Sequence, residues 1–275
     1  MVLSVFIIII CVICVLLYLG GYSLRVTLCA YGLISLLLIA SIGHAGQLSA
    51  TPYRPTVSNP AELSALRHVE IEFGTQLNQP AEQEQRSSLP YLIKYPFHAQ
   101  WGLLIGGEAW LETRDAAGSN SGFGNTAVLL KHYHPLSETL AVGFEAGAVL
   151  PTADQPSGQG STDYSGNLII SQDVNNLRID VNAGVTRQGY RAADSSRFLY
   201  NWALAASHPL TERWGIAGEF SGIFDPQYPS SSQFMATLNY APAAQLVLDF
   251  GSTAGITGAS DDYTVFAGFT WLLAP

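Results

Sequence analysis

Cysteine and long apolar runs are missing from most of this sequence. All three cysteines, Cys11, Cys14 and Cys29, lie near the beginning, and none follows. Their absence from the rest of the chain excludes a disulfide framework and cysteine-based metal sites there. After Ile42 there is also no run of about 20 apolar residues, which a membrane helix would need. The larger part of the chain is therefore not a helical membrane protein.

Charge is also scarce, and most of it is negative. Charged residues make up 12% of the chain, against a usual level of about 25%. The formal net charge is −9, from 12 Lys and Arg against 21 Asp and Glu. Binding to nucleic acid depends on basic residues that neutralise phosphates. The composition therefore excludes nucleic acid as a partner.

The beginning of the chain holds two apolar stretches, at residues 2–19 and 26–42. The second follows Arg25 and ends at Gly43-His44-Ala45, a small-x-small sequence typical of signal cleavage. We interpret residues 1–45 as a signal or targeting segment, with a helical hairpin kept in the inner membrane as the alternative. Residues 1–24 are then an extension upstream of the true start. Residues 46–66 are predicted to be a periplasmic leader.

The rest of the chain consists of short amphipathic segments whose connections alternate in length. Between Arg67 and Leu273 there are about twelve such segments, the strand number of an intermediate-sized barrel. The long connections are polar and rich in Gly, Ser and Asp, as in residues 152–162, and the short ones are tight, as at Asn175-Asn176. An up-and-down barrel sorts its connections this way, with the short turns on the periplasmic side, whereas a β-sandwich has no reason to do so. Residues 67–275 are predicted to be an all-β, transmembrane, up-and-down antiparallel barrel of about 12 strands.

Within each segment the side chains divide into an apolar face and a polar face. In residues 177–186, for example, Leu177, Ile179 and Val181 alternate with polar residues. Period 2 indicates a strand, and the polar face of a membrane barrel lines the lumen. The charges predicted on the lumen face are Glu70, Glu72, Lys94, Glu108, Glu112, Arg114, Lys131, Glu145, Arg178, Asp180, Glu219 and Asp249. Aromatic residues near the segment ends, such as Trp101 and Trp214, are typical of interfacial girdles.

Several glycine-rich motifs resemble a known family. They include Gly122-Phe123-Gly124-Asn125 leading to Lys131, residues 151–154, residues 158–164, and residues 246–251 with 260–268. This pattern is similar to that of the "MetA-pathway of phenol degradation" family of outer-membrane barrels. The resemblance implies an outer-membrane location in a Gram-negative bacterium and a transport role near aromatic-degradation pathways. The chain departs from the usual barrel ending, because it closes on Ala274-Pro275 rather than on Phe or Tyr.

The residues give little support for catalysis or for a cofactor. A membrane phospholipase of this size would need a Ser two positions after a His, and no such pair occurs. His132 and His134 share a strand face, but the sequence shows no third ligand, so no metal is expected. We expect a protein that is not an enzyme and has no cofactor.

The expected function is passive passage of small hydrophobic or aromatic molecules, a substrate class that the resemblance implies. The predicted lumen pathway consists of Glu108, Glu112, Arg114, Lys131, Arg178, Asp180 and Glu219. The alternative is a structural or assembly barrel that transports nothing and whose lumen is closed by ion pairs. The leader, residues 46–66, is long enough to enter the lumen. Expected partners are outer-membrane lipid and the barrel-insertion machinery.

Overall fold

The computed structural model describes residues 48–79, 85–115, 117–154, 160–189 and 197–273. The predicted signal segment and start site, residues 1–45, lie outside these described residues, as does the Ala274-Pro275 ending. The strands are β1 (Glu70–Gln79), β2 (Gln85–His98), β3 (Trp101–Asp115), β4 (Gly118–Gly122), β5 (Thr126–Pro135), β6 (Leu140–Leu150), β7 (Asp163–Val174), β8 (Leu177–Arg187), β9 (Phe198–Pro209), β10 (Trp214–Phe224), β11 (Ser231–Ala243), β12 (Leu246–Gly255) and β13 (Tyr263–Leu272).

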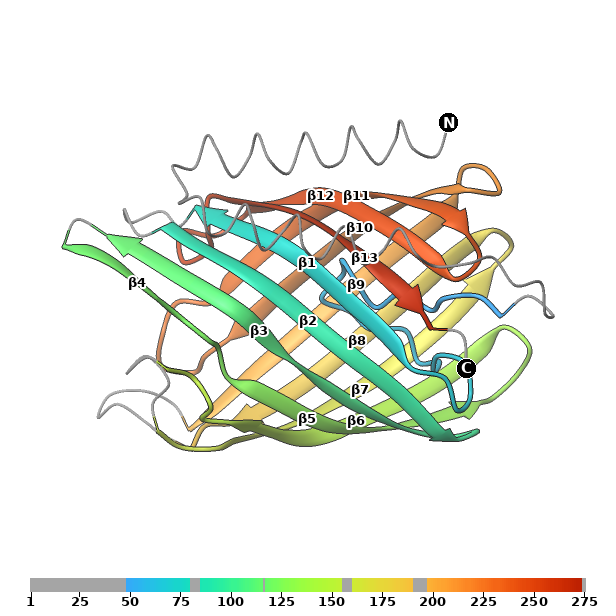
Figure 1. Ribbon diagram of the computed structural model, residues 1–275, viewed down its shortest axis with the longest axis horizontal. Helices are drawn as coiled ribbons and strands as arrows, with labels where there is room; N and C mark the ends of the chain where they lie inside the picture. Colours follow the sequence, from blue (N-terminus) through green and yellow to red (C-terminus); the bar gives the residue numbers. More distant parts are fainter. Residues whose placement is uncertain (1–47, 80–84, 116, 155–159, 190–196, 274–275) are drawn as a thin grey trace. The chain divides into compact units, whose positions relative to one another are not determined.

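The strands form a closed antiparallel barrel (Figure 1). Each strand pairs with its neighbours in sequence, and the ring closes where β1 pairs with β13 along its whole length. β4 pairs only with β3, past the point where β3 leaves β5. The wall therefore has 12 strands, and β4 extends it at one rim. This confirms the predicted all-β, up-and-down fold.

The connections are sorted by length, as the sequence predicts. β7 and β8 are joined by Asn175-Asn176, and Asn175 has a φ of 57°, a left-handed conformation that Asn tolerates in a tight turn. The other short turns, β2–β3, β5–β6, β9–β10 and β11–β12, lie at the same end of the barrel. No helix long and apolar enough to cross a membrane occurs in the part of the chain that the structure describes.

The outer face of the wall is apolar and the inner face is polar, which is the reverse of a soluble protein. Large apolar side chains point outward and stay exposed, including Leu168 (53%), Phe220 (48%) and Leu204 (46%). Charged side chains such as Glu70 (0%) and Lys131 (0%) are buried inside. An exposed apolar belt around a polar interior is the arrangement of a barrel whose outer face contacts lipid.

Candidate functional site in the barrel lumen

Residues 48–66 lie inside the barrel and are called the lumen segment below. In Figure 1 this segment is the blue trace that precedes β1. Its two ends are tied to the short-turn end of the wall: Ala50 N donates to Ala244 O (2.8 Å), and Arg67 N donates to Pro96 O (2.7 Å). The segment thus enters from the end predicted to be periplasmic and returns to it.

Side chains of the wall, rather than a sheet, satisfy the backbone of the lumen segment. Glu72 accepts hydrogen bonds from Tyr53 N (2.7 Å) and Arg54 N (3.0 Å). Glu219 likewise accepts hydrogen bonds from Val57 N (3.1 Å) and Ser58 N (2.8 Å). Three more backbone N–H groups donate to Glu70, Asn182 and Ser171. Because an irregular buried backbone needs partners, these side chains on β1, β7, β8 and β10 hold the segment in place.

Two buried lysines bind the same segment from β2 and β5. Lys94 Nζ lies 2.6 Å from Glu70 Oε1 and 2.5 Å from Glu72 Oε1, and it donates to Thr51 O (2.6 Å). Lys131 Nζ lies 3.0 Å from Glu145 Oε1 and donates to Pro60 O (2.6 Å). Each ammonium group is therefore shared between carboxylates of the wall and a carbonyl of the segment. A buried charge needs such compensation, because its desolvation is costly.

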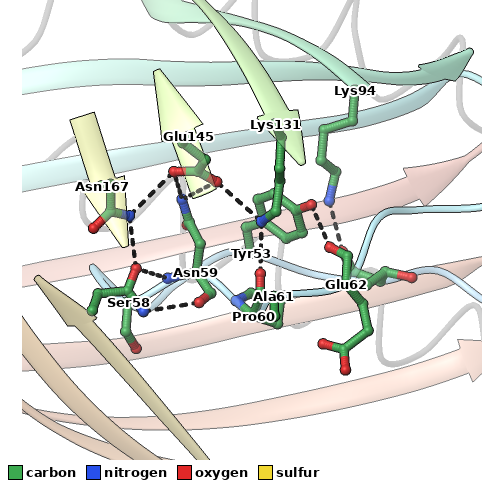
Figure 2. Close-up of polar contacts among 12 residues, drawn as sticks. Tyr53, Ser58, Asn59, Pro60, Ala61, Glu62, Lys94, Lys131, Glu145 and Asn167 are labelled. Atoms are coloured by element: carbon green, nitrogen blue, oxygen red, sulfur yellow. Dashed lines mark hydrogen bonds and ion pairs between the residues drawn. The ribbon is translucent and has the colours of Figure 1, made fainter. Parts of the chain in front are cut away.

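Tyr53 lies between these two lysines. The ammonium groups of Lys94 and Lys131 are 3.9 Å and 4.0 Å from the centroid of its ring, and Figure 2 shows them on either side of it. The phenol O–H donates to Glu62 O at 2.7 Å. Burial raises the pKa of the Tyr53 phenol well above its usual range, and the neighbouring carboxylates raise it further. The phenol is therefore neutral and acts as a donor.

Arg54 reaches the wall at β1, β13 and β12, where two glycines make room for it. Its guanidinium contacts Asp249, with Nη2 3.2 Å from Oδ1 and Nε 3.3 Å from Oδ2. A Cβ added at Gly74 would lie 2.4 Å from Arg54 Nη2, and one at Gly268 would lie 2.6 Å from Nε. Any larger residue at either position would displace the guanidinium.

Arg178 and Asp180 hold the end of the lumen segment nearer β1. The Arg178 guanidinium pairs with Glu62 of the segment and with Asp180 (3.1 Å) and Asp173 (3.3 Å) of the wall. Asp180 also accepts a hydrogen bond from Ser171, whose Oγ in turn accepts from Ala61 N.

Asn59 Nδ2 donates to both oxygens of Glu145 (3.1 Å), as part of the network drawn in Figure 2.

The three remaining residues of the predicted pathway lie away from the lumen segment, near the long-loop end. Glu108 pairs with Arg86 at 2.6 Å, and both side chains remain partly exposed.

The prediction that Glu112 and Arg114 lie on the lumen face is wrong. β3 has one extra residue between Glu108, which pairs with Pro90, and Leu111, which pairs with Ser88. Such a bulge turns the following side chains over, so Glu112 and Arg114 lie on the face opposite Glu108.

The structure thus divides the predicted pathway residues into three groups. Lys131, Arg178 and Glu219 contact the lumen segment, and Asp180 belongs with them because it holds Arg178 and Ser171, which both contact the segment. Glu108 faces the outer lumen, and Glu112 pairs with Arg114 at 3.1 Å on the other face. Whether any of them guides a solute remains a prediction. Sequence reasoning did not identify Tyr53, Arg54 or Asn59, because an irregular segment has no periodicity to mark its contacts.

His132 and His134 lie on the outer face of β5, near the short-turn end. Their rings are 6.4 Å apart, and the Trp101 ring is 4.5 Å from that of His132. This is the setting of an interfacial aromatic cluster. Among the described residues there is no group of three or more His, Cys, Asp or Glu side chains that could hold a metal ion.

Residues 71–273 match the family described as "Putative MetA-pathway of phenol degradation". The chain belongs to this family. The match covers nearly the whole barrel, from β1 to the end of β13, and leaves the lumen segment outside it. No protein of curated function matches the sequence.

Solved structures with a similar fold are outer-membrane barrels. The NanC porin is 11% identical, with a TM-score of 0.56, over 74% of this chain and 100% of its own. The KdgM porin is 9% identical, with a TM-score of 0.53, over 74% and 99%. The toluene transporter TbuX of Ralstonia pickettii is 11% identical, with a TM-score of 0.43, over 78% of this chain and 92% of its own. At these identities the likeness establishes the fold alone, that of a porin-like barrel.

Proposed function

We propose that this protein is an outer-membrane barrel of a Gram-negative bacterium that passes small hydrophobic or aromatic molecules, and that its lumen segment closes the barrel at rest. The observation that carries the proposal is the segment itself. It contacts inward side chains of β1, β2, β5, β6, β7, β8, β10 and β12. A segment that reaches nearly every side of the wall closes a constitutive pore.

The contacts of the lumen segment are of a kind that can be exchanged. Most are hydrogen bonds and ion pairs, whose loss costs little net free energy only when water or a solute takes the place of the lost partner. The buried apolar cluster around the segment is small, consisting of Ala61, Ala141 and Ile169 with Tyr133 packed against it. Displacement of the segment therefore requires water or a solute to replace polar partners, rather than the exposure of a large apolar core.

The lumen wall beyond the segment supports the class of solute. By strand alternation, Leu92, Leu129, Val149 and Phe266 face the lumen there, and each is only partly buried. Polar side chains such as Gln76, Asn78 and Gln233 share this face, so the wall offers apolar contacts beside hydrogen-bonding groups, a combination that sites for small ligands use. The family description, which names phenol degradation, supports an aromatic solute.

The second candidate is a structural or assembly barrel that transports nothing. The observation that favours it is the same buried network, because ion pairs such as Lys94 with Glu70 and Lys131 with Glu145 close the lumen as a polar core would. The two candidates differ in whether the ion pairs and hydrogen bonds around the lumen segment ever separate to let a solute pass.

The test is flux through the purified protein, prepared after expression of the full chain. Reconstituted into liposomes, it is expected to accelerate entry of phenol and toluene but not of a large oligosaccharide. The Glu219→Gln variant, which weakens two contacts of the segment, is expected to increase that flux. Folded protein that passes no small aromatic molecule, with or without the substitution, would support the structural candidate instead.

A further inference from the structure

The environment of Tyr53 is built like a binding site for a phenol. Its side chain is 2% exposed, and its ring has a cation at 3.9 Å and another at 4.0 Å. Two ammonium groups repel one another, and here Glu70, Glu72 and Glu145 offset that repulsion from the wall side. The remaining attraction is directed at a π face, which aromatic rings provide and aliphatic groups do not.

Most of this site belongs to the wall and would remain if the segment moved. Lys94, Lys131 and their carboxylate partners lie on β1, β2, β5 and β6. When the segment leaves, each ammonium group loses one neutral acceptor, Thr51 O for Lys94 and Pro60 O for Lys131. A ligand that carries an aromatic ring and a hydroxyl oxygen would replace both the π face and one of the lost acceptors.

We propose that the site between Lys94 and Lys131 binds a small phenolic molecule, and that Tyr53 occupies it as a resident substitute until such a molecule displaces it. The inference rests on the proposed function and deepens it, because it names the ligand class and the event that releases the segment. The solute and the Tyr53 side chain then compete for one site, so binding of the solute releases the lumen segment and opens the lumen.

A single introduced cysteine can follow that competition. The sequence has no cysteine after Cys29, so a cysteine at position 58 is easily distinguished. Ser58 is 1% exposed, and its hydroxyl has no hydrogen-bond partner in the described part of the chain, so Ser58→Cys is expected to be tolerated. Maleimide labelling at that position, read by peptide mass spectrometry, reports release of the segment.

The labelling rate of full-chain Ser58→Cys, in native membranes, is measured with phenol, toluene and cyclohexanol. Saturating phenol is expected to raise the rate about tenfold, because a solute that selects the open state increases its population. Toluene, which lacks the hydroxyl, is expected to have a smaller effect, and cyclohexanol, which lacks the π face, none. Equal rates with and without phenol, or equal effects of phenol and cyclohexanol, would overturn the proposal.

A second measurement uses variants of the site. In Tyr53→Ala, half-saturation by phenol, followed through thermal melting, is expected at about a tenfold lower concentration than in the wild type, because the resident competitor is gone. Ile169→Ala is the matched control, since it opens a cavity beside Ala61 and Ala141 without a cationic partner in that cluster. It is expected to show no preference for phenol over cyclohexanol, whereas Tyr53→Ala that binds both equally would contradict the inference.

Flux separates this inference from the proposed function. If liposomes that contain the protein take up small aromatics while phenol neither speeds labelling nor favours Tyr53→Ala, the transport function stands and the Tyr53 site is a structural contact only. If the protein binds phenol selectively but no solute crosses the membrane, the phenol site is supported and the proposed transport function is wrong.

Discussion

The two halves of the lumen use charge in different ways. In the half next to the short turns, Lys131, Glu145 and Glu219 are buried, and each has a partner in the lumen segment or beside it. The Arg178 cluster at the rim of this half is partly exposed. In the half next to the long loops, the Arg86–Glu108 pair is partly exposed and contacts no residue of the segment among its described contacts. The same residue types thus bind the lumen segment at one end and form a partly exposed pair at the other.

This difference shows that a charged lumen residue is not by itself evidence of a solute path. A buried ion pair is costly to break from one side, because the remaining charge has no partner. An exposed pair contributes little, because water and salt screen it. Substitutions should therefore have large effects near the segment and small effects near the mouth.

Removal of the lumen segment is expected to have the largest effect. A chain that lacks residues 48–66 should show discrete, salt-dependent conductance steps in a planar bilayer, where the wild type is silent, because this segment fills the lumen at the level of Glu72 and Glu219. Circular dichroism confirms that the variant keeps its strands. A folded but silent deletion variant would mean that something other than the segment closes the barrel.

Lys131→Met should cause the largest loss of stability for a single substitution. It leaves Glu145 without its cation and Pro60 O without its donor. The free energy of unfolding is expected to fall by about 3–5 kcal/mol, measured by urea unfolding in lipid. Arg86→Gln, whose side chain is 36% exposed in the other half of the lumen, is the matched control and should change stability by less than about 1 kcal/mol. Similar losses in both variants would remove the distinction between the two halves.

Glu219→Gln should loosen the segment without disrupting the wall. An amide oxygen is a weaker acceptor than a carboxylate for Val57 N and Ser58 N, and the expected loss is about 1–2 kcal/mol. In the Ser58→Cys background, this loss corresponds to roughly a tenfold faster labelling rate. Glu108→Gln, in the other half, should leave the rate unchanged. An effect of Glu108→Gln as large as that of Glu219→Gln would show that the halves are coupled.

Glu108→Gln is expected to have the smallest effect on stability, within about 1 kcal/mol, because its pair with Arg86 is partly exposed. It should instead change selectivity. In the barrel opened by deletion of residues 48–66, the reversal potential in a salt gradient should shift away from cation preference, since a negative charge at the mouth attracts cations. An unchanged potential would place Glu108 outside the conduction path.

Much of the fold could be predicted from local patterns in the sequence. Alternation such as that of Leu177, Ile179 and Val181 identifies the strands, and the sorted connections identify an up-and-down barrel, because each strand pairs with its neighbour in sequence. The strict period of 2 also identifies the lumen charges. It fails at Glu112 and Arg114, where one extra residue in β3 reverses the faces. Pro90 on β2 and Gly106-Gly107 on β3 flank this position, but the alternation by itself does not show that β3 carries an extra residue there.

The sequence by itself thus determined the strands, the lipid face and the presence of buried charges of both signs, since these follow from side-chain periodicity and from the cost of placing charge in lipid. Only the tertiary structure decided what those charges do. The contacts of Tyr53 with Lys94 and Lys131, and of Arg54 with Asp249, join residues far apart in the chain. They exist because closure of the barrel surrounds an irregular segment with polar side chains, an arrangement that no local pattern encodes.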